Sequence, residues 1–171
     1  MSEERDGSSV GGGACRDSSR RSGQPRTMTL PWRHSLVVGA SSGIGEALGR
    51  QLGAAGGRVA LVARRREVLE RLADEIGRDR ALVFPHDVTR GEEVRALFPE
   101  ICRVLGGLDL FVYAAGVMPP VAPDEWDITK DRDIIMVNVL GAMAWIGEAA
   151  QRFERGRSGT LVGLSSVAGD R

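Results

Sequence analysis

Apolar residues in this chain follow two patterns that alternate along its length. Short, mostly apolar runs occupy residues 36–38, 59–62, 81–84, 110–113 and 160–164. Runs of this kind, without strict alternation, are typical of strands that are buried on both faces of a sheet. Because segments with helical periodicity separate the runs, the pattern predicts a parallel sheet with helices on both of its faces.

The helical periodicity is clearest after the first, second and third runs. There, apolar residues recur every three or four positions, which places them on one face of a helix. Residues 131–153 contain no proline and are rich in Ala, Ile and Met, so we expect one long helix there, whereas the prolines within 118–127 predict a loop. The positions expected to face the sheet are Ile44, Leu48, Leu52, Val68, Leu69, Leu72, Ile76, Val94, Leu97, Phe98, Ile101 and Leu105.

A glycine-rich turn joins the first run to the first helical segment. We expect Gly39 to permit the tight turn, Gly43 to leave no Cβ between backbone and ligand, and Gly45 to let the helix pack closely on its strand. The N–H groups and the dipole at the start of that helix favour an anion. A pyrophosphate is therefore the expected occupant of this turn.

Small or polar residues also follow the later runs. The carboxyl ends of parallel strands meet at one edge of the sheet, and ligands bind there, near the point where the strand order reverses. The sequence therefore predicts one site at this edge. The residues concerned are Ser41, Ser42, Arg64, Asp87, Ala115, Gly116, Ser165 and Ser166.

Composition narrows the classes of function. The 171 residues, 42% of them apolar, suffice for one domain with a core, and the formal net charge of zero gives no reason to expect nucleic-acid binding. No apolar run approaches the roughly 20 residues that cross a bilayer, so we expect no membrane-spanning helix. Two cysteines, Cys15 and Cys102, suit a reducing, cytoplasmic compartment. Because His34 and His86 have no ligand partners at metal-binding spacing, we expect no metal site.

The first 33 residues differ in composition from the rest. They are rich in Ser, Gly and Arg, so we interpret residues 1–33 as a disordered leader and residues 34–171 as the folded domain. A transit peptide is the alternative, but acidic residues within the segment count against it. A further hypothesis places the natural start at Met28, immediately before the folded pattern.

Together these residues resemble the short-chain dehydrogenase/reductase family over about residues 35–169. The resemblance implies a Rossmann-type doubly wound parallel α/β sheet that binds a nicotinamide cofactor. About five strands would be present, with the C-terminal strands and helices missing. The family's glycine turn matches Gly39, Ser41, Ser42, Gly43, Ile44 and Gly45, its adenine loop Asp87 and Val88, its fourth-strand end Ala115 and Gly116, its helix asparagine Asn138, and its catalytic serine Ser166.

The end of the second run indicates which cofactor is preferred. NAD-binding proteins of this fold usually have a carboxylate there for the ribose hydroxyls, whereas an arginine suits the additional phosphate of NADP. Here Ala63 is followed by Arg64, whose guanidinium can form paired hydrogen bonds to phosphate. We therefore expect NADP rather than NAD. The alternative is that the arginines simply form a solvated basic helix start.

The resemblance also implies a reaction, namely hydride transfer between the nicotinamide and a carbonyl or alcohol carbon of a small molecule. In the family a serine holds the substrate oxygen, a tyrosine passes its proton, a lysine four residues later lowers the pKa of that tyrosine, and the asparagine supports a water relay. The chain holds one tyrosine, Tyr113, and one lysine, Lys130, and neither matches that pair. We therefore expect a fragment, inactive alone, of an oxidoreductase that forms homo-oligomers when complete and assembles poorly as this chain.

The same residues also fit other interpretations. A noncatalytic dinucleotide-binding or partner-binding module would keep the glycine turn and lack the chemistry. Asp87 could merely cap a turn, Asn138 could be a satisfied polar residue in a helix, and Ser166 could merely follow a strand. Tyr113 and Ala114 stand where the family often has two asparagines, so the amides that would bond neighbouring strands are missing and the local order of this sheet edge is left open. Trp126 and Trp145 are expected to be packing residues.

Overall fold

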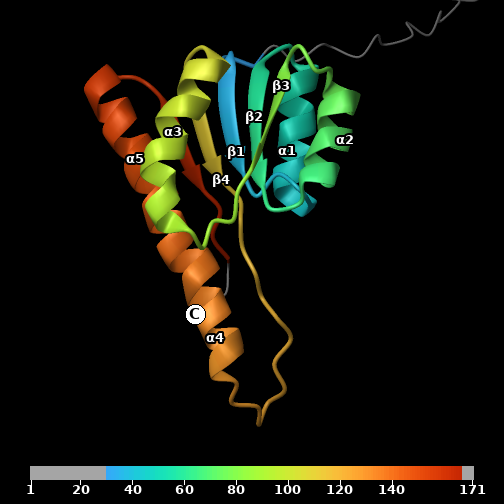
Figure 1. The fold of residues 1–171 in the computed structure, drawn as a ribbon, viewed down its shortest axis with the longest axis vertical. Helices are drawn as coiled ribbons and strands as arrows, with labels where there is room; N and C mark the ends of the chain where they lie inside the picture. Colours follow the sequence, from blue (N-terminus) through green and yellow to red (C-terminus); the bar gives the residue numbers. More distant parts are fainter. Residues whose placement is uncertain (1–29, 167–171) are drawn as a thin grey trace, which may run out of the picture.

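The computed structural model describes residues 30–166, in which five parallel strands form one sheet in the order β3-β2-β1-β4-β5 (Figure 1). The strands are β1 (His34–Val38), β2 (Arg58–Ala63), β3 (Ala81–Pro85), β4 (Leu110–Tyr113) and β5 (Thr160–Gly163). The helices are α1 (Gly43–Ala54), α2 (Arg66–Ile76), α3 (Gly91–Leu105), α4 (Ile128–Ile134), the π-helical segment η1 (Ile135–Gly141) and α5 (Ala142–Gly156). The predicted α/β fold class is confirmed.

The strand order reverses at β1. The chain runs from β1 outward to β2 and β3, then crosses to the other side for β4 and β5. Val38 pairs in register with both Val62 and Tyr113, so the carboxyl ends of these three strands are level. In doubly wound sheets this reversal is where ligands bind.

Helices cover both faces of the sheet, α1 and α2 on one and α3 and α5 on the other (Figure 1). Successive residues of β1 point to opposite faces: Leu36 and Val38 belong to the core cluster under α3 and α5, and Val37 to the cluster under α1 and α2. Because both faces are covered, Leu36, Val37 and Val38 can all be apolar, as the sequence predicts. β5 lies at the sheet edge and is only half-buried.

The helix positions predicted to face the sheet are buried or partly buried, with one exception. Leu52, Leu72 and Ile101 are buried, and Leu48 packs against the cluster under α1. Ile44 is wrong as a core position because its side chain is 64% exposed. It stands in the first turn of α1, next to the turn that follows β1.

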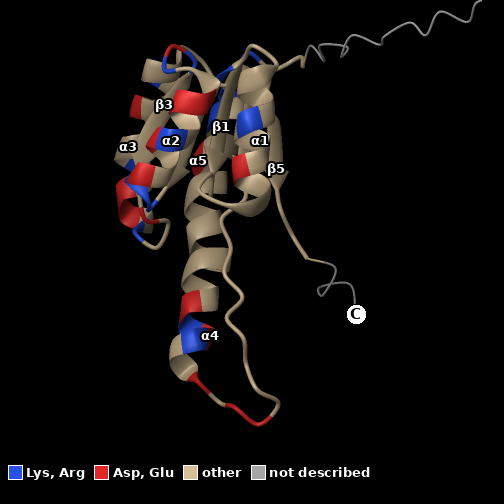
Figure 2. Cartoon of the chain, turned by 90° about the vertical axis from the view of Figure 1, so that its right-hand side faces the viewer, with Lys and Arg blue, Asp and Glu red and all other residues tan. Residues whose placement is uncertain are grey.

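The predicted long helix extends further than expected and contains a π-helical segment. α4, η1 and α5 form one helical stretch from Ile128 to Gly156. Its most apolar window has a mean hydropathy of 1.4, so the expectation that no segment could cross a membrane is wrong as to length and composition. Figure 2 shows charge at its far end and little in the middle. Trp145 and Ala149 are nevertheless buried in the core, as in a core helix.

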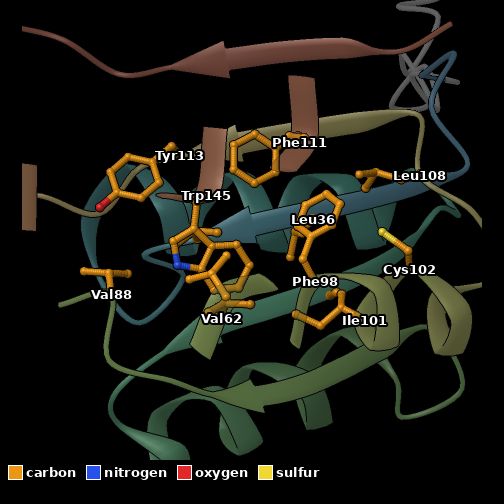
Figure 3. Packing of buried hydrophobic residues seen from close by; sticks show 14 of the residues in the cluster. Leu36, Val62, Val88, Phe98, Ile101, Cys102, Leu108, Phe111, Tyr113 and Trp145 are labelled. Atoms are coloured by element: carbon orange, nitrogen blue, oxygen red, sulfur yellow. The ribbon is translucent and has the colours of Figure 1, made fainter. Parts of the chain in front are cut away.

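The two tryptophans expected to pack differ in their surroundings. Trp145 is completely buried, and its ring meets Phe98 of α3 edge-on (Figure 3). Trp126 is 96% exposed in the loop before α4, so the expectation is wrong for this residue. The loop predicted over 118–127 is confirmed, and with α4 it projects beyond the sheet (Figures 1 and 2).

Candidate functional site

The turn between β1 and α1 is as tight as its glycines predict. Gly39 has a φ of +92°, and a Cβ there would lie 2.4 Å from the backbone nitrogen of Ala115. A Cβ on Gly45 would lie 2.2 Å from the carbonyl oxygen of Gly39, so Gly45 packs on the turn rather than on the strand. Gly43 has a φ of +56° and open space beside it. The turn therefore presents bare backbone to a ligand.

Arg65 ties this turn to the end of β2. Its Nη2 donates hydrogen bonds to the carbonyl oxygen of Ser41 at 2.9 Å and to the hydroxyl of Ser41 at 3.1 Å. Ser42 immediately precedes α1, and its side chain makes no capping hydrogen bond. Two guanidinium groups, those of Arg64 and Arg65, thus stand at the edge of the sheet beside a helix N-terminus, an arrangement that favours an anion.

Asp87 follows β3 and is held by the next turn. Its Oδ1 accepts hydrogen bonds from the N–H of Thr89 at 3.0 Å and from the Thr89 hydroxyl at 2.9 Å. Burial raises the pKa of Asp87, but these bonds and the charges of Arg64 and Arg90 outweigh it, so the pKa lies below its usual value. The turn-capping role considered from the sequence is present, and the carboxylate is ionised at neutral pH.

His86 lies next to Asp87, with its side chain 4% exposed. The ring packs edge-on against Trp145 at a centroid distance of 5.4 Å, and its Nε2 is 3.5 Å from Oε2 of Glu93. Neither ring nitrogen has a hydrogen-bond partner among the described residues. Burial lowers the pKa of His86, partly offset by the carboxylates of Glu93 and Asp87. The imidazole is therefore neutral near pH 7.

Two adjoining clefts at the carboxyl edge bring most of the predicted site residues together. Ser42 and residues 114–117 line both clefts, whereas Gly45 lines neither because it lies beneath the turn. The first cleft, of about 160 Å³, is lined by Gly39, Ser41, Ser42, Ala63, Arg64, Arg65, His86, Asp87, Val88, Ala114, Ala115, Gly116, Val117 and Val137. The second is lined by residues that include Gly43, Ile44, Tyr113, Asn138, Ser165 and Ser166.

The side-chain amide of Asn138 is paired with the backbone of Val117. Val117 N–H donates to Oδ1 of Asn138 at 2.8 Å, and Nδ2 of Asn138 donates to the Val117 carbonyl at 2.9 Å. Asn138 lies within η1, and Val117 lies just beyond the end of β4. The amide thus joins the long helix to the loop that lines both clefts.

Ser165 and Ser166 follow β5 and are exposed along the second cleft. Ala168 and Gly169, which with these serines match the serine segment of the family that the sequence resembles, lie outside the described residues. Residues 1–29 of the predicted leader lie outside them as well.

Sequence reasoning missed contributions from Arg65, His86 and Tyr113. The hydroxyl of Tyr113 donates a 2.7 Å hydrogen bond to the Val137 carbonyl, and Tyr113 is buried, so a contact other than the family's amides orders this sheet edge. The sequence signal for this contact was Tyr113 itself, which stands in the fourth apolar run where the family often has an asparagine. For Arg65, the only signal was its place beside Arg64.

A glycine turn, a basic strand end and a carboxylate around a cleft at the strand-order reversal are the features of a Rossmann-type α/β protein. Comparison with known proteins identifies the family within this class of fold. The sequence model described as short chain dehydrogenase matches residues 33–171, and the chain belongs to that family.

Relatives from staphylococci share about a third of the aligned residues. An uncharacterized oxidoreductase of Staphylococcus aureus strain MW2 is 34% identical over 135 residues, which cover 79% of this chain and 58% of the relative. One from Staphylococcus haemolyticus is 32% identical over 139 residues, covering 81% and 60%. The chain therefore spans somewhat more than half the length of these relatives.

Solved structures agree with the fold. A short-chain dehydrogenase from Streptomyces avermitilis superposes with a TM-score of 0.75 at 31% identity, covering 82% of this chain and 51% of that one. One from Mycobacterium marinum gives 0.73 at 31% identity, covering 85% and 60%. ElxO with NADP bound gives 0.73 at 23% identity, covering 82% and 58%, a likeness of fold alone.

Proposed function

We propose that this chain is the cofactor-binding part of an oxidoreductase that uses NADP rather than NAD and acts on a small carbonyl or alcohol substrate. The observation that carries the proposal is the end of β2. Ala63 stands where a carboxylate would pair with ribose hydroxyls, and Arg64 and Arg65 line the first cleft. A guanidinium forms paired hydrogen bonds with phosphate, which suits the 2′-phosphate of NADP.

The residues present fit a dinucleotide. The turn at Gly39 and Gly43 exposes backbone at the start of α1, where the helix dipole favours a pyrophosphate. Asp87 and Val88 lie along the same cleft and would border the adenine, with Ala115 and Gly116 on the side of β4. ElxO, which has the same fold, binds NADP. A Cβ at Gly39 would fill the space that the backbone of Ala115 occupies.

The second cleft would receive the substrate. When bound there, the nicotinamide supplies hydride-transfer chemistry. We propose that the Ser166 hydroxyl holds the substrate oxygen and that Asn138 fixes the loop at Val117 beside it.

In such a reaction the substrate oxygen gains or loses a proton, and a further group must supply or accept that proton. Tyr113 is buried with its hydroxyl donated to Val137, and Lys130 pairs with Glu125 and donates to the Pro120 carbonyl at 2.8 Å. These are the one tyrosine and the one lysine of the sequence. We therefore propose that the 171-residue chain binds the cofactor without turnover. The same observation supports the second candidate, a noncatalytic dinucleotide-binding module.

A charge reversal at Arg64 tests the cofactor assignment. We expect Arg64→Asp to weaken NADPH binding by about tenfold or more, because a charge-assisted phosphate contact contributes roughly 1.4 kcal/mol or more. NADH binding should strengthen, since the new carboxylate can accept from the ribose hydroxyls. Titration calorimetry with both cofactors measures the two changes.

Arg66→Ala is the matched control. Arg66 is the next arginine in the sequence, but its guanidinium lies 3.6 Å from Glu70 on α2 and does not line the first cleft. Its variant should bind NADPH as the parent chain does. Equal NADPH affinity in Arg64→Asp and the parent chain would refute the assignment.

A further inference from the structure

A hydrogen bond from β4 reaches the π-helical segment that carries Asn138. Tyr113 is buried at the end of β4, and its hydroxyl donates to the carbonyl oxygen of Val137, the residue before Asn138, at 2.7 Å. In Figure 3 the Tyr113 ring lies at the margin of the core cluster, and its hydroxyl points away from Phe111. A carbonyl oxygen has two lone pairs, so it can accept the phenol in addition to a helical N–H.

Gly141 makes room for this contact. It lies in η1, and a Cβ there would be 2.7 Å from the Tyr113 hydroxyl oxygen and 3.0 Å from the carbonyl oxygen of Val88. The small residue therefore lets the helix approach both the end of β4 and the loop beside the first cleft. π-Helical turns within α-helices are rare and occur frequently at functional sites.

The amide of Asn138 completes the connection. It forms two hydrogen bonds with the backbone of Val117, the residue that lines both clefts. The phenol of Tyr113 thus connects β4 to η1, and the amide of Asn138 connects η1 to the loop that follows β4. Burial raises the pKa of Tyr113, so the phenol keeps its proton and remains a donor at neutral pH.

We propose that Tyr113 is a positioning residue: its hydroxyl fixes the π-helical segment so that the Asn138 amide clamps the cleft-lining loop at Val117. The role of that loop at a substrate and cofactor site rests on the proposed function. The contacts of the clamp are observed within this chain and do not depend on that function. Tyr113 is thus assigned to the site by its contact with helix backbone rather than by proton transfer.

Amide hydrogen exchange of the ¹⁵N-labelled 171-residue chain tests the positioning role directly. In Tyr113→Phe, exchange at the Val117 N–H should rise by about tenfold or more, and the Asn138 side-chain NH₂ resonances should move toward solvent-exposed positions. Exchange of the β1 amides should stay unchanged. Thr160→Val, which removes a hydroxyl that accepts from Nε1 of Trp32 at 3.3 Å, is the matched control and should leave Val117 as it is.

Gly141→Ala provides an independent variant, because its added Cβ displaces the phenol without removing it. It should raise Val117 exchange as Tyr113→Phe does, and Asn138→Ala should give the same rise with no further increase in the double variant with Tyr113→Phe. The proposal is overturned if Val117 protection is unchanged in both Tyr113→Phe and Gly141→Ala, or if exchange rises equally at Val117 and in β1.

Cofactor binding separates this inference from the proposed function. Under the proposed function NADPH would occupy both clefts, whereas adenosine 2′,5′-bisphosphate would occupy the first alone. Tyr113→Phe should weaken the binding of NADPH by about threefold and leave the binding of the bisphosphate unaffected. An equal loss of affinity for both ligands counts against the positioning role. Failure of the parent chain to bind either ligand defeats the proposed function, while the exchange result still decides on Tyr113.

Discussion

Single atoms decide the shape of the glycine turn. The carbonyl oxygen of Gly39 occupies the place where a Cβ of Gly45 would be, and the backbone of Ala115 occupies the place beside Gly39. Backbone atoms cannot move aside as a flexible side chain can. These two glycines are therefore required by packing, whereas Gly43, with open space beside it, is left for a ligand.

Replacing Gly45 tests this packing. Gly45→Ala should destabilise the fold by about 1–3 kcal/mol, the usual cost of overpacking, and should weaken NADPH binding because the turn must shift. Urea unfolding measures the first effect. Gly147→Ala is the control, because Gly147 lies in α5 with nothing within 4 Å of an added Cβ, so alanine there should stabilise the helix by up to about 1 kcal/mol. A Gly45→Ala variant as stable as the parent would contradict the account.

His86 should make stability depend on pH. Burial lowers its pKa, the carboxylates of Glu93 and Asp87 oppose this, and Arg90 lowers the pKa through its charge and raises it through its backbone. The folded chain therefore binds fewer protons than the unfolded chain below pH 6.5. The part of the free energy of unfolding that is linked to His86 is fully present above pH 6.5. It falls as the pH drops through 6.5 toward the lower folded pKa, by at most about 1.4 kcal/mol per pH unit. Urea unfolding between pH 7.5 and 5 should give a flatter profile for His86→Gln. Identical slopes would exclude His86 as the source.

Among the elements, the long helix connects most parts of the molecule. Trp145 of α5 meets His86 at the end of β3 and Phe98 of α3, while η1 meets Tyr113 and Val88. The helix therefore packs on the core with one end and reaches the clefts through its π-helical segment. Its loop and α4 extend away from the sheet (Figure 2).

The two tryptophans offer a matched test of this packing. Trp145→Ala should cost about 3–5 kcal/mol, because it leaves a cavity between α5, α3 and the sheet. Trp126→Ala should change stability by less than about 0.5 kcal/mol, since Trp126 is 96% exposed. Chemical unfolding followed by circular dichroism gives both values. Similar values for the two variants would mean that α5 is not anchored by Trp145.

The sequence predicts strands and helices well where periodicity reflects burial on both faces of the sheet. β4 is found over the predicted residues 110–113, and β1 begins two residues before the predicted run 36–38. The π-helical segment was not predictable, since its residues carry an ordinary helical pattern and its geometry depends on the distant Tyr113. Likewise, Arg64 and Arg65 are adjacent and of the same type, so the sequence does not distinguish their contacts. Only the folded structure shows that Arg65 contacts Ser41.

For the whole molecule, the described residues form an open sheet with β3 at one edge and β5 at the other. β5 is at the edge, with Leu161 and Leu164 partly exposed, and the chain spans 58% of the Staphylococcus aureus relative. The cofactor residues predicted from the sequence lie at or just beyond the carboxyl ends of β1, β2, β3 and β4. The second cleft is lined by residues from the start of α1, the end of β4 and the loop after it, the long helix, and the end of β5 with the residues after it. The sequence pattern did not single out Tyr113 or Val117 as part of it.

The central claim is that this chain binds NADP through the glycine turn and the arginines after β2. Titration calorimetry of the purified 171-residue chain with NADPH and with NADH is the most direct measurement. The account predicts saturable binding of one NADPH per chain, at least tenfold tighter than NADH. Equal affinity for the two, or tighter binding of NADH, would contradict the assignment of Arg64 and Arg65 to the 2′-phosphate, and the absence of binding to either would contradict the claim itself.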